Sequence, residues 1–277
     1  MKSFLIDSHC HLQFNAFNQD RLEVINRMRQ ENISGIIIGG NYEESQEAIE
    51  LAEKENFFVS IGLHPIHVEE INDGFQGVVK AEKFEKEKFI EFLKNPIVKA
   101  IGECGLDYFH LQDESKKQEQ KEIFEAQVDL AQEFKKPLIL HIRDKGDFSS
   151  YQDVLDILQE KKYSGENIGV VHFFSANWEI AQKFLELGFY LSFTGVITFT
   201  HQYDEAIKNI PIERLLVETD SPYVAPNPFR GKRCEPIYVK YVAQRIAEIK
   251  NISLEEVAKI TTKNCIELFG LEKVQSK

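Results

Sequence analysis

"FLIDSHCHLQF" (residues 4–14) runs from three apolar residues straight into Asp7, His9 and His11. The three apolar residues are typical of a buried β-strand. Because side chains alternate along a strand, His9 and His11 point to one side and Cys10 points to the other. A single His-x-His pair is a weak signal and also occurs by chance in turns. Its meaning depends on the residues at which the other strands of the chain end.

This strand-like segment is the first of eight along the chain. The predicted strands are residues 4–7, 36–39, 58–62, 98–103, 138–141, 169–172, 190–194 and 215–220. Segments with apolar residues at helical spacing lie between them, among them 21–30, 43–55, 116–136 and 151–162. Eight alternations of strand and helix predict an α/β fold, a single (β/α)8 TIM-type barrel, with a doubly wound open sheet as the competing architecture. We expect residues 1–277 to form one domain, since barrels of ~250 residues are common.

Three further segments have a clear local pattern. Residues 81–95 alternate in charge and predict a solvated helix. The proline-rich residues 221–236 predict a loop after the eighth strand. Residues 252–270 predict a closing pair of helices that stops at Gly270.

Most of the predicted strands end in, or run into, a side chain that can bind a metal ion. These side chains are His9, His11, His64, Glu103, His141, His172, Glu218 and Asp220. The carboxyl ends of barrel strands share one face and build the active site, so we expect these residues to meet there. Alternation separates Glu103 from Cys104, and Asp220 is better placed than Glu218 because it is nearer the strand end. The expected metal ligands are therefore His9, His11, Glu103, His141, His172 and Asp220.

Four imidazoles and two carboxylates exceed the ligands of one catalytic zinc ion, so we expect two divalent metal ions. The expected division is His9, His11 and Asp220 on one ion, His141 and His172 on the other, and Glu103 as the bridge. Such a pair activates water for hydrolysis. We expect Asp220 to accept the proton of that water, so Asp220 and Glu103 are the expected catalytic residues. Histidine ligands favour zinc or manganese, whereas a bridging carboxylate and a phosphate substrate also suit magnesium.

Composition limits the partners of the chain. The formal net charge of −12 argues against a broad surface for nucleic acid, because a polyanion would be repelled by most of it. The four cysteines show no C-x-x-C pair, so neither a structural zinc site nor a disulfide framework is indicated. No apolar run is long enough for a signal-peptide core or a membrane span. We therefore expect a cytoplasmic enzyme that does not bind membranes.

Seven stretches together resemble one family. They are DSHCHL (7–12), GLHP (62–65), GECGLDY (102–108), LHIRD (140–144), VHFFSA (171–176), ETDSPY (218–223) and NPFRGKRCEP (227–236). The chain resembles the TatD family of metal-dependent deoxyribonucleases, within the amidohydrolase-like barrels, from residue 7 to about residue 269. The resemblance implies a TIM-type barrel with two divalent metal ions that hydrolyses DNA, often from a 3′ end. It implies the same six metal ligands, and it places His64 near the substrate phosphate.

The chain departs from the family pattern at four positions. Ile66 precedes His67 where the family usually has its second histidine, and Cys234 stands at a common asparagine. Phe173 and Ala176 alter a motif that usually reads His-Cys-Phe-Ser-Gly. None of the four is an expected metal ligand, so these departures bear on substrate contacts.

Cations on the expected active face are candidates for binding phosphate groups. Arg143 and Lys145 follow the fifth strand, and the loop after the eighth strand carries Arg230, Lys232 and Arg233. Nearby aromatic residues that are candidates for stacking on unpaired bases are Phe14, Tyr108, Phe173 and Tyr223. A small positive site on a negative body favours single-stranded DNA or 3′ ends over long duplex. We expect a monomer or a weak oligomer.

Two other functions are compatible with these residues. A related hydrolase of a small amide, ester or aminoacyl-RNA would use the same pair of metal ions, since barrels support many reactions through their loops. A non-catalytic scaffold or nucleic-acid-binding module is the less favoured alternative, because a barrel with its own core has no structural need for this ligand set.

Overall fold

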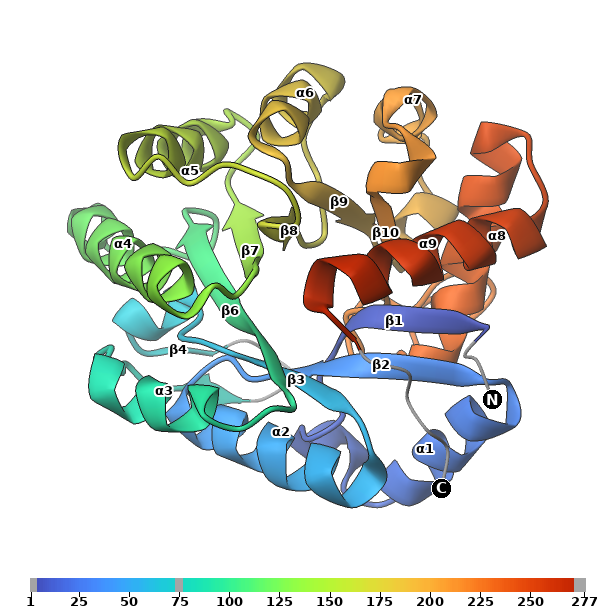
Figure 1. The fold of residues 1–277 in the computed structure, drawn as a ribbon, viewed down its shortest axis with the longest axis horizontal. Coiled ribbons are helices and arrows are strands. Elements are labelled where there is room, and N and C mark those ends of the chain that lie inside the picture. The colour runs from blue at the N-terminus through green and yellow to red at the C-terminus, as the bar shows by residue number, and fades with distance from the viewer. Residues whose placement is uncertain (1–3, 73–76, 272–277) are drawn as a thin grey trace.

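The computed structural model describes residues 4–72 and 77–271 as a barrel of parallel strands surrounded by helices (Figure 1). The eight strands are β1 (Leu5–Cys10), β2 (Ile33–Ile38), β3 (Phe58–Ile61), β6 (Val98–Asp107), β7 (Leu138–Arg143), β8 (Gly169–Val171), β9 (Tyr190–Phe193) and β10 (Leu215–Val217). They pair in the order β1-β2-β3-β6-β7-β8-β9-β10. A doubly wound sheet would reverse the strand order near its middle. The predicted TIM-type barrel is therefore confirmed.

The barrel closes between β1 and β10, just beyond the end of β10. Cys10 and Ser221 form an isolated parallel bridge there. The N–H of His11 donates to the carbonyl of Ser221 (2.8 Å), and the N–H of Asp220 donates to that of His9 (2.9 Å). The first and last strands thus meet where the histidine pair and Asp220 lie.

Helices surround the strands and begin and end at recognisable caps. Within the described residues the α-helices are α1 (Arg21–Gln30), α2 (Tyr42–Glu55), α3 (Lys86–Leu93), α4 (Lys117–Phe134), α5 (Ser149–Glu160), α6 (Trp178–Leu187), α7 (Asp204–Asn209), α8 (Val239–Lys250) and α9 (Leu254–Phe269). The shorter elements are β4 (Ile71–Asn72), β5 (Val78–Val79) and the 3-10 helices η1 (Asn15–Phe17), η2 (Pro65–Val68), η3 (Glu114–Lys116), η4 (Gly195–Thr198), η5 (Ile212–Arg214) and η6 (Pro236–Tyr238). Asn41 caps α2 and Ser253 caps α9 by accepting a first-turn N–H. None of these helices is long and apolar enough to cross a lipid bilayer.

Three predicted segments differ from the structure. Residues 252–270 contain one helix, α9, whose partner α8 lies before them. The two helices separate at Asn251, which has a left-handed conformation (φ 55°) that ends α8. In residues 81–95 the helix begins only at Lys86, and β6 continues past Glu103 to Asp107. The proline-rich loop after β10 is present as predicted.

The interior of the barrel is apolar at the amino ends of the strands. One buried cluster contains Ile6, Ile36, Ile38, Ala100, Ile139, Val170, Tyr190 and Leu216 from the strands, with Cys265, Leu268, Phe269 and Leu271 from α9 and the residues after it. Figure 1 shows α9 lying across β1 and β10. The helix therefore covers this end of the barrel, and the interior is a packed core rather than a pore.

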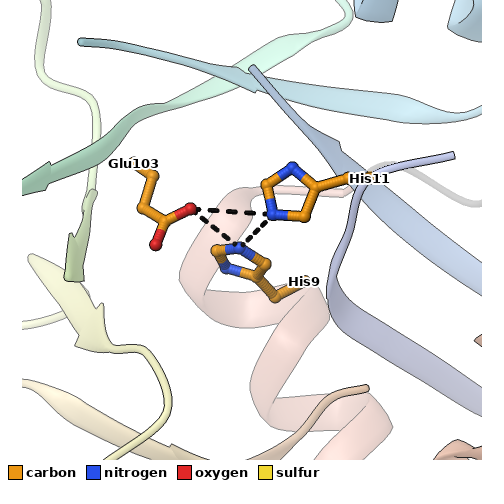
Figure 2. Close-up of side chains that lie close together, drawn as sticks. All are labelled: His9, His11 and Glu103. Atoms are coloured by element: carbon orange, nitrogen blue, oxygen red, sulfur yellow. Dashed lines mark hydrogen bonds and ion pairs between the residues drawn. The ribbon is translucent and has the colours of Figure 1, made fainter. Parts of the chain in front are cut away.

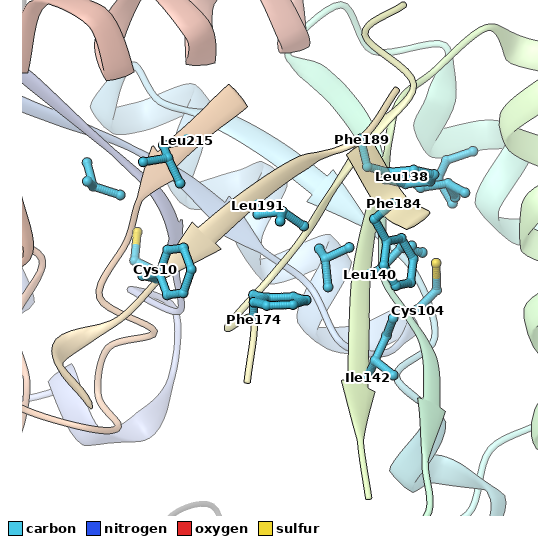
Figure 3. Packing of buried hydrophobic residues seen from close by; sticks show 14 of the residues in the cluster. Cys10, Cys104, Leu138, Leu140, Ile142, Phe174, Phe184, Phe189, Leu191 and Leu215 are labelled. Atoms are coloured by element: carbon cyan, nitrogen blue, oxygen red, sulfur yellow. The ribbon is translucent and has the colours of Figure 1, made fainter. Parts of the chain in front are cut away.

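A larger cluster packs the outer faces of the strands against the helices (Figure 3). Leu138 and Leu140 of β7 belong to it, as does Phe184 of α6. Cys10 and Cys104 are fully buried in the same cluster. The prediction that both cysteines are packing residues is confirmed, and the residues beside them point inward.

The side-chain alternation of two strands changes along their length. The pairing register of β1 shifts between Asp7 and Cys10, and that of β6 shifts beside Glu103. In β1, Ile6 belongs to the apolar interior, yet His9 also points inward three residues later. Strict alternation would put residues three apart on opposite faces, so the shift re-aims the second half of the strand.

Candidate metal centre

The carboxyl ends of the strands surround a cavity of about 690 Å³. Five of the six expected metal ligands line it, and they are His11, Glu103, His141, His172 and Asp220. His9 lies directly behind them and is fully buried. The structure thus brings together side chains from both ends of the sequence, as the strand-end pattern predicts.

His9, His11 and Glu103 form the tightest group (Figure 2). The Nε2 atoms of the two histidines are 3.1 Å apart, and Glu103 Oε2 lies 3.2 Å from His9 Nε2 and 3.7 Å from His11 Nε2. Ligands bound 2.0–2.1 Å from a tetrahedral zinc ion are ~3.3 Å from one another. The three atoms therefore have the chemistry and the spacing of ligands that share a cation.

Glu103 presents its second oxygen to a different group of imidazoles. Oε1 lies 2.8 Å from His141 Nδ1, 3.3 Å from His64 Nε2 and 3.7 Å from His172 Nε2. One carboxylate thus faces nitrogen ligands on both sides, which is the arrangement that a bridging ligand requires. His64, expected near the substrate phosphate, lies inside the cluster and forms a candidate group with Glu103 and His141.

Asp220 lies just after β10 in a left-handed conformation (φ 58°). Its Oδ1 is 3.5 Å from His11 Nε2, 3.7 Å from His9 Nε2 and 3.8 Å from His172 Nε2. Burial alone would raise the pKa of Asp220, but the imidazoles around it, His172 first, lower the pKa below its usual range. The carboxyl group is therefore held in its ionised form.

The carboxylates also raise the pKa of two histidines. Burial opposes protonation of both, but Glu218, Asp220 and Glu103 raise the pKa of His172 to about 10. Hydrogen bonds that Asp107 and Glu103 accept from His141 outweigh burial and raise the pKa of His141 to about 9. A cation that binds these imidazoles must displace protons, so its affinity rises with pH.

Two buried carboxylates orient the histidines from behind. Glu218 Oε1 lies 2.9 Å from His172 Nδ1, and Glu218 also accepts hydrogen bonds from Phe173 N (2.7 Å) and Ser192 Oγ (2.6 Å). Asp107 Oδ2 lies 3.0 Å from His141 Nε2. A carboxylate behind a histidine fixes the orientation of the ring and increases its basicity.

Asp107 is a site residue that the sequence analysis missed. Strand alternation contains the signal, since Glu103, Gly105 and Asp107 lie two residues apart. The glycines hid it, because they suggest that the strand ends. In the structure a Cβ on Gly105 would collide with the backbone of His141, so this glycine permits the close packing of β6 on β7.

Glu44, in the first turn of α2, also lines the cavity and was not predicted. Its Oε2 accepts a hydrogen bond from Gly40 N (3.0 Å). Burial raises the pKa of Glu44 to about 7. It stands in an acidic, amphipathic helix, where nothing in the sequence distinguishes it from the solvated glutamates beside it.

Of the predicted phosphate-binding cations, one lines the cavity in the structure and the others do not. Arg143 lines the cavity, with its guanidinium carbon 4.4 Å from the centre of the Phe109 ring. Arg230 and Lys232 are exposed and lie outside the lining, as does Arg233. Lys145 is also exposed and lies 3.8 Å from Glu114.

Arg233 is held by acidic partners outside the cavity. Its guanidinium lies 2.6 Å from Asp20 and 3.1 Å from Glu235. The expectation that the loop directs this cation into the active site is therefore not met, because the carboxylates neutralise it where the loop meets α1.

Of the aromatic residues predicted to stack on bases, three line the cavity and one does not. Phe14 stacks on His11 with the ring centres 4.4 Å apart, and Tyr223 and Phe173 also line the cavity. Tyr108 does not, because it is buried and its hydroxyl donates to Asp153 (2.7 Å). Its neighbour Phe109 is 46% exposed and lines the cavity instead.

Two of the four departures from the family pattern, Ile66 and Phe173, line the cavity. Ala176 and Cys234 are buried, and neither lines it. Of the four departures, the first pair therefore changes the lining of the cavity.

Comparison with known proteins gives one consistent result. The family model for TatD related DNase matches residues 6–270. An uncharacterized metal-dependent hydrolase of Bacillus subtilis, YabD, is 39% identical, with 96% of this chain and 99% of the relative covered. YcfH of Escherichia coli, also an uncharacterized metal-dependent hydrolase, is 34% identical, with 97% of each chain covered.

Solved structures agree with the sequence relatives. The TatD homologue YJJV from Escherichia coli superposes with a TM-score of 0.83 at 26% identity, over 98% of this chain and 100% of the other. A TatD family hydrolase from Entamoeba histolytica superposes with a TM-score of 0.80 at 25% identity, over 97% of this chain and 99% of the other. A dihydroorotase from Campylobacter jejuni, 14% identical with a TM-score of 0.58, shares the fold alone.

Proposed function

The chain belongs to the family of TatD-related DNases and is a metal-dependent hydrolase, and from this we propose that it hydrolyses phosphodiester bonds in DNA, removing nucleotides from single-stranded 3′ ends. The observation that carries the proposal is the position of Glu103, whose two oxygens face separate groups of imidazoles. This arrangement suits two divalent ions, and phosphoester hydrolysis is a reaction that such sites perform.

We assign the ligands by the oxygen or nitrogen atoms that face one another. One ion would be held by His9, His11 and Asp220 and the other by His141 and His172, and Glu103 would be the ligand shared by both. His64 Nε2 lies 3.3 Å from Glu103 Oε1, beside the second group, and we assign it to contact with the phosphate. Divalent cations, when bound, lower the pKa of a water molecule and stabilise negative charge on phosphate oxygens.

The side chains supply the proton acceptor and its orientation. Asp220, ionised and within 4 Å of three imidazoles, accepts the proton of the attacking water at its carboxylate. Glu218 and Asp107 keep His172 and His141 oriented for their ligand roles. These positioning carboxylates stand behind the histidines and do not touch the substrate.

The net charge of the protein favours the end of a DNA strand as the substrate. Arg143 is the one lysine or arginine among the residues that line the cavity in the described chain. With a net charge of −12 the remaining surface repels a polyanion. Binding therefore neutralises few phosphates, and its affinity depends only weakly on salt.

The test is hydrolysis of end-labelled single-stranded and 3′-overhang DNA by metal-loaded protein, with and without a chelator. We expect a chelator-sensitive ladder that shortens from the 3′ end. Glu103→Ala should be slower by at least about 1,000-fold, more than the 10–100-fold cost of losing a supporting residue. Asp220→Asn should lose activity and bind the metal more weakly, because it replaces a proposed carboxylate ligand with a neutral amide, whereas Glu255→Gln, at an exposed position on α9, should match the unmodified protein.

Intact DNA in the presence of bound metal would contradict the proposal. It would favour a hydrolase of a small amide, ester or aminoacyl-RNA. The acidic lining favours this second function if the substrate has an amine, since Glu44 and Asp144 also line the cavity. A panel of esters and amides assayed beside the DNA would distinguish the two.

A further inference from the structure

Phe109 and Arg143 form an exposed stack at the edge of the cavity. The ring of Phe109 is 46% exposed, and the Arg143 guanidinium lies over it at 4.4 Å. Phe109 is the single large, exposed apolar side chain among the described residues that lines the cavity. Exposed apolar surface beside an active site commonly marks a place where a ligand binds.

The charge of Arg143 is available to a ligand. No carboxylate within the described part of the chain forms an ion pair with it, although acidic residues outnumber basic ones by 45 to 33. By contrast, Arg27 and Arg233 each lie within 3.1 Å of Glu235. A guanidinium without a carboxylate partner, at the entrance of a hydrolytic cavity, fits an anionic substrate.

The stack is held rigidly by the end of β6. Asp107 Oδ1 accepts hydrogen bonds from the N–H groups of Phe109 and His110, both at 2.9 Å. The N–H of Tyr108 donates to the carbonyl of Arg143 (2.7 Å) and joins the ends of β6 and β7. Because the backbone on both sides is fixed before binding, little conformational entropy is lost when a ligand contacts the stack.

Asp107 also links the stack to the metal cluster. Its Oδ2 lies 2.7 Å from His110 Nδ1 and 3.0 Å from His141 Nε2. One carboxylate thus contacts both a proposed metal ligand and the segment that carries Phe109. The stack therefore belongs to the same cavity wall as Asp107 and His141.

We propose that Arg143 and Phe109 form a platform on which the unpaired base of the nucleotide next to the scissile phosphodiester stacks. This inference rests on the proposed function and names the form of DNA that the site accepts. Bases stack on aromatic rings and on the plane of an arginine guanidinium without regard to base identity. A base inside a duplex is already stacked and paired, so a frayed or single-stranded end is the preferred substrate.

The test compares binding of deoxyadenosine monophosphate and of 2-deoxyribose 5-phosphate to the metal-loaded protein by calorimetry. The second ligand has a hydroxyl group at the position where the first carries its base. We expect the unmodified protein to bind the nucleotide about 5- to 150-fold more tightly, the range for stacking one base. Phe109→Ala should lose most of this preference, and Phe109→Trp should retain it.

Two further variants separate stacking from charge and from general effects. Arg143→Lys keeps the positive charge but not the plane, so it should bind 2-deoxyribose 5-phosphate normally and lose part of the base preference. Phe4→Ala removes a phenylalanine that is 39% exposed and lies outside the cavity, and it should behave as the unmodified protein does. An equal base preference in Phe109→Ala and the unmodified protein would overturn the platform.

The proposal and the DNase function fail in different ways. Cleavage rates are measured for two oligonucleotides, one of them with an abasic 3′ nucleotide. If DNA is cut and Phe109→Ala discriminates between them as the unmodified protein does, the platform is wrong and the nuclease stands. If DNA is not cut while nucleotide binding still depends on Phe109, the stack still binds a base, but the nuclease and the position of that base beside a scissile phosphodiester are wrong.

Discussion

At one end of the barrel the interior is apolar and covered by α9, whereas at the other end it is filled with imidazoles and carboxylates. The same strands build both ends. Burying apolar side chains stabilises the fold. Burying charged groups costs free energy unless they are paired or bind metals. The closed end therefore stabilises the fold, and the buried charges at the open end lower that stability.

β1 shows the change within a single strand. Ile6 packs in the apolar interior, and His9 and His11 face the cluster a few residues later. The register shift in β1 allows both Ile6 and His9 to point into the barrel. Side chains alternate regularly before the shift and after it, but the inward-facing positions change from even-numbered to odd-numbered residues. Substitutions at one end are thus expected to leave the other intact.

The largest effect on stability is expected at the closed end. Phe269 is 3% exposed in the cluster that seals the barrel, and Phe269→Ala should lower the free energy of unfolding by about 3–5 kcal/mol. Activity per folded molecule should not change. Urea unfolding and the rate at low temperature measure the two quantities, with Leu22→Ala, at a 60% exposed position, as the control. A loss of activity in the folded Phe269→Ala protein would break the comparison.

An intermediate effect is expected from metal at the open end. A cation that binds only the folded protein raises the free energy of unfolding by about 2.7 kcal/mol at 100 times its dissociation constant. Urea unfolding of chelator-treated protein, with and without added manganese, measures this gain. Phe269→Leu should show the same gain as the unmodified protein, since distant sites add independently. A smaller gain in that variant would show that the two ends are coupled.

The smallest effect is expected at the outer edge of the open end, where Asp20 pairs with Arg233. The hydrogen bond from Arg233 outweighs partial burial and lowers the pKa of Asp20. Because the folded pKa lies below the unfolded value of about 3.9, the stabilisation is complete above that value and is lost as the pH falls through the folded pKa.

Asp20→Asn should therefore reduce the free energy of unfolding by less than about 1 kcal/mol at pH 7. The difference between Asp20→Asn and the unmodified metal-free protein should begin to shrink as the pH falls below about 3.9 and continue to shrink down to the folded pKa. Denaturant unfolding at several pH values measures it. A difference that stays constant over this range would mean that the charge of Asp20 has no part in it.

The sequence predicts the barrel and the ligand cluster well for a physical reason. Apolar runs of strand length identify the strands, and the chemistry concentrates at their carboxyl ends. His9 and His11 flank Cys10, so alternation alone assigns both histidines to one face and the cysteine to the core. Local pattern carries this information without knowledge of the fold.

The features of the site that could not be predicted depend on contacts between residues that are distant in sequence. The sequence indicates that Arg233 is free to bind a phosphate group. In the fold it pairs with Asp20, at a sequence separation of 213 residues. Asp107 was hidden because glycines that allow β6 to approach β7 resemble a strand end. Whether a side chain is free to act depends on what the fold brings near it, and neither residue type nor strand position records that.

The cap formed by α9 also limits how a polymer can move. With the amino end of the barrel filled over the described residues, whatever enters the cavity must leave by the same mouth. A long chain therefore cannot be threaded through the barrel. Under the proposed function, each released nucleotide has to leave by this mouth before the shortened strand advances, so the rate of product release sets an upper limit on the rate of successive cuts.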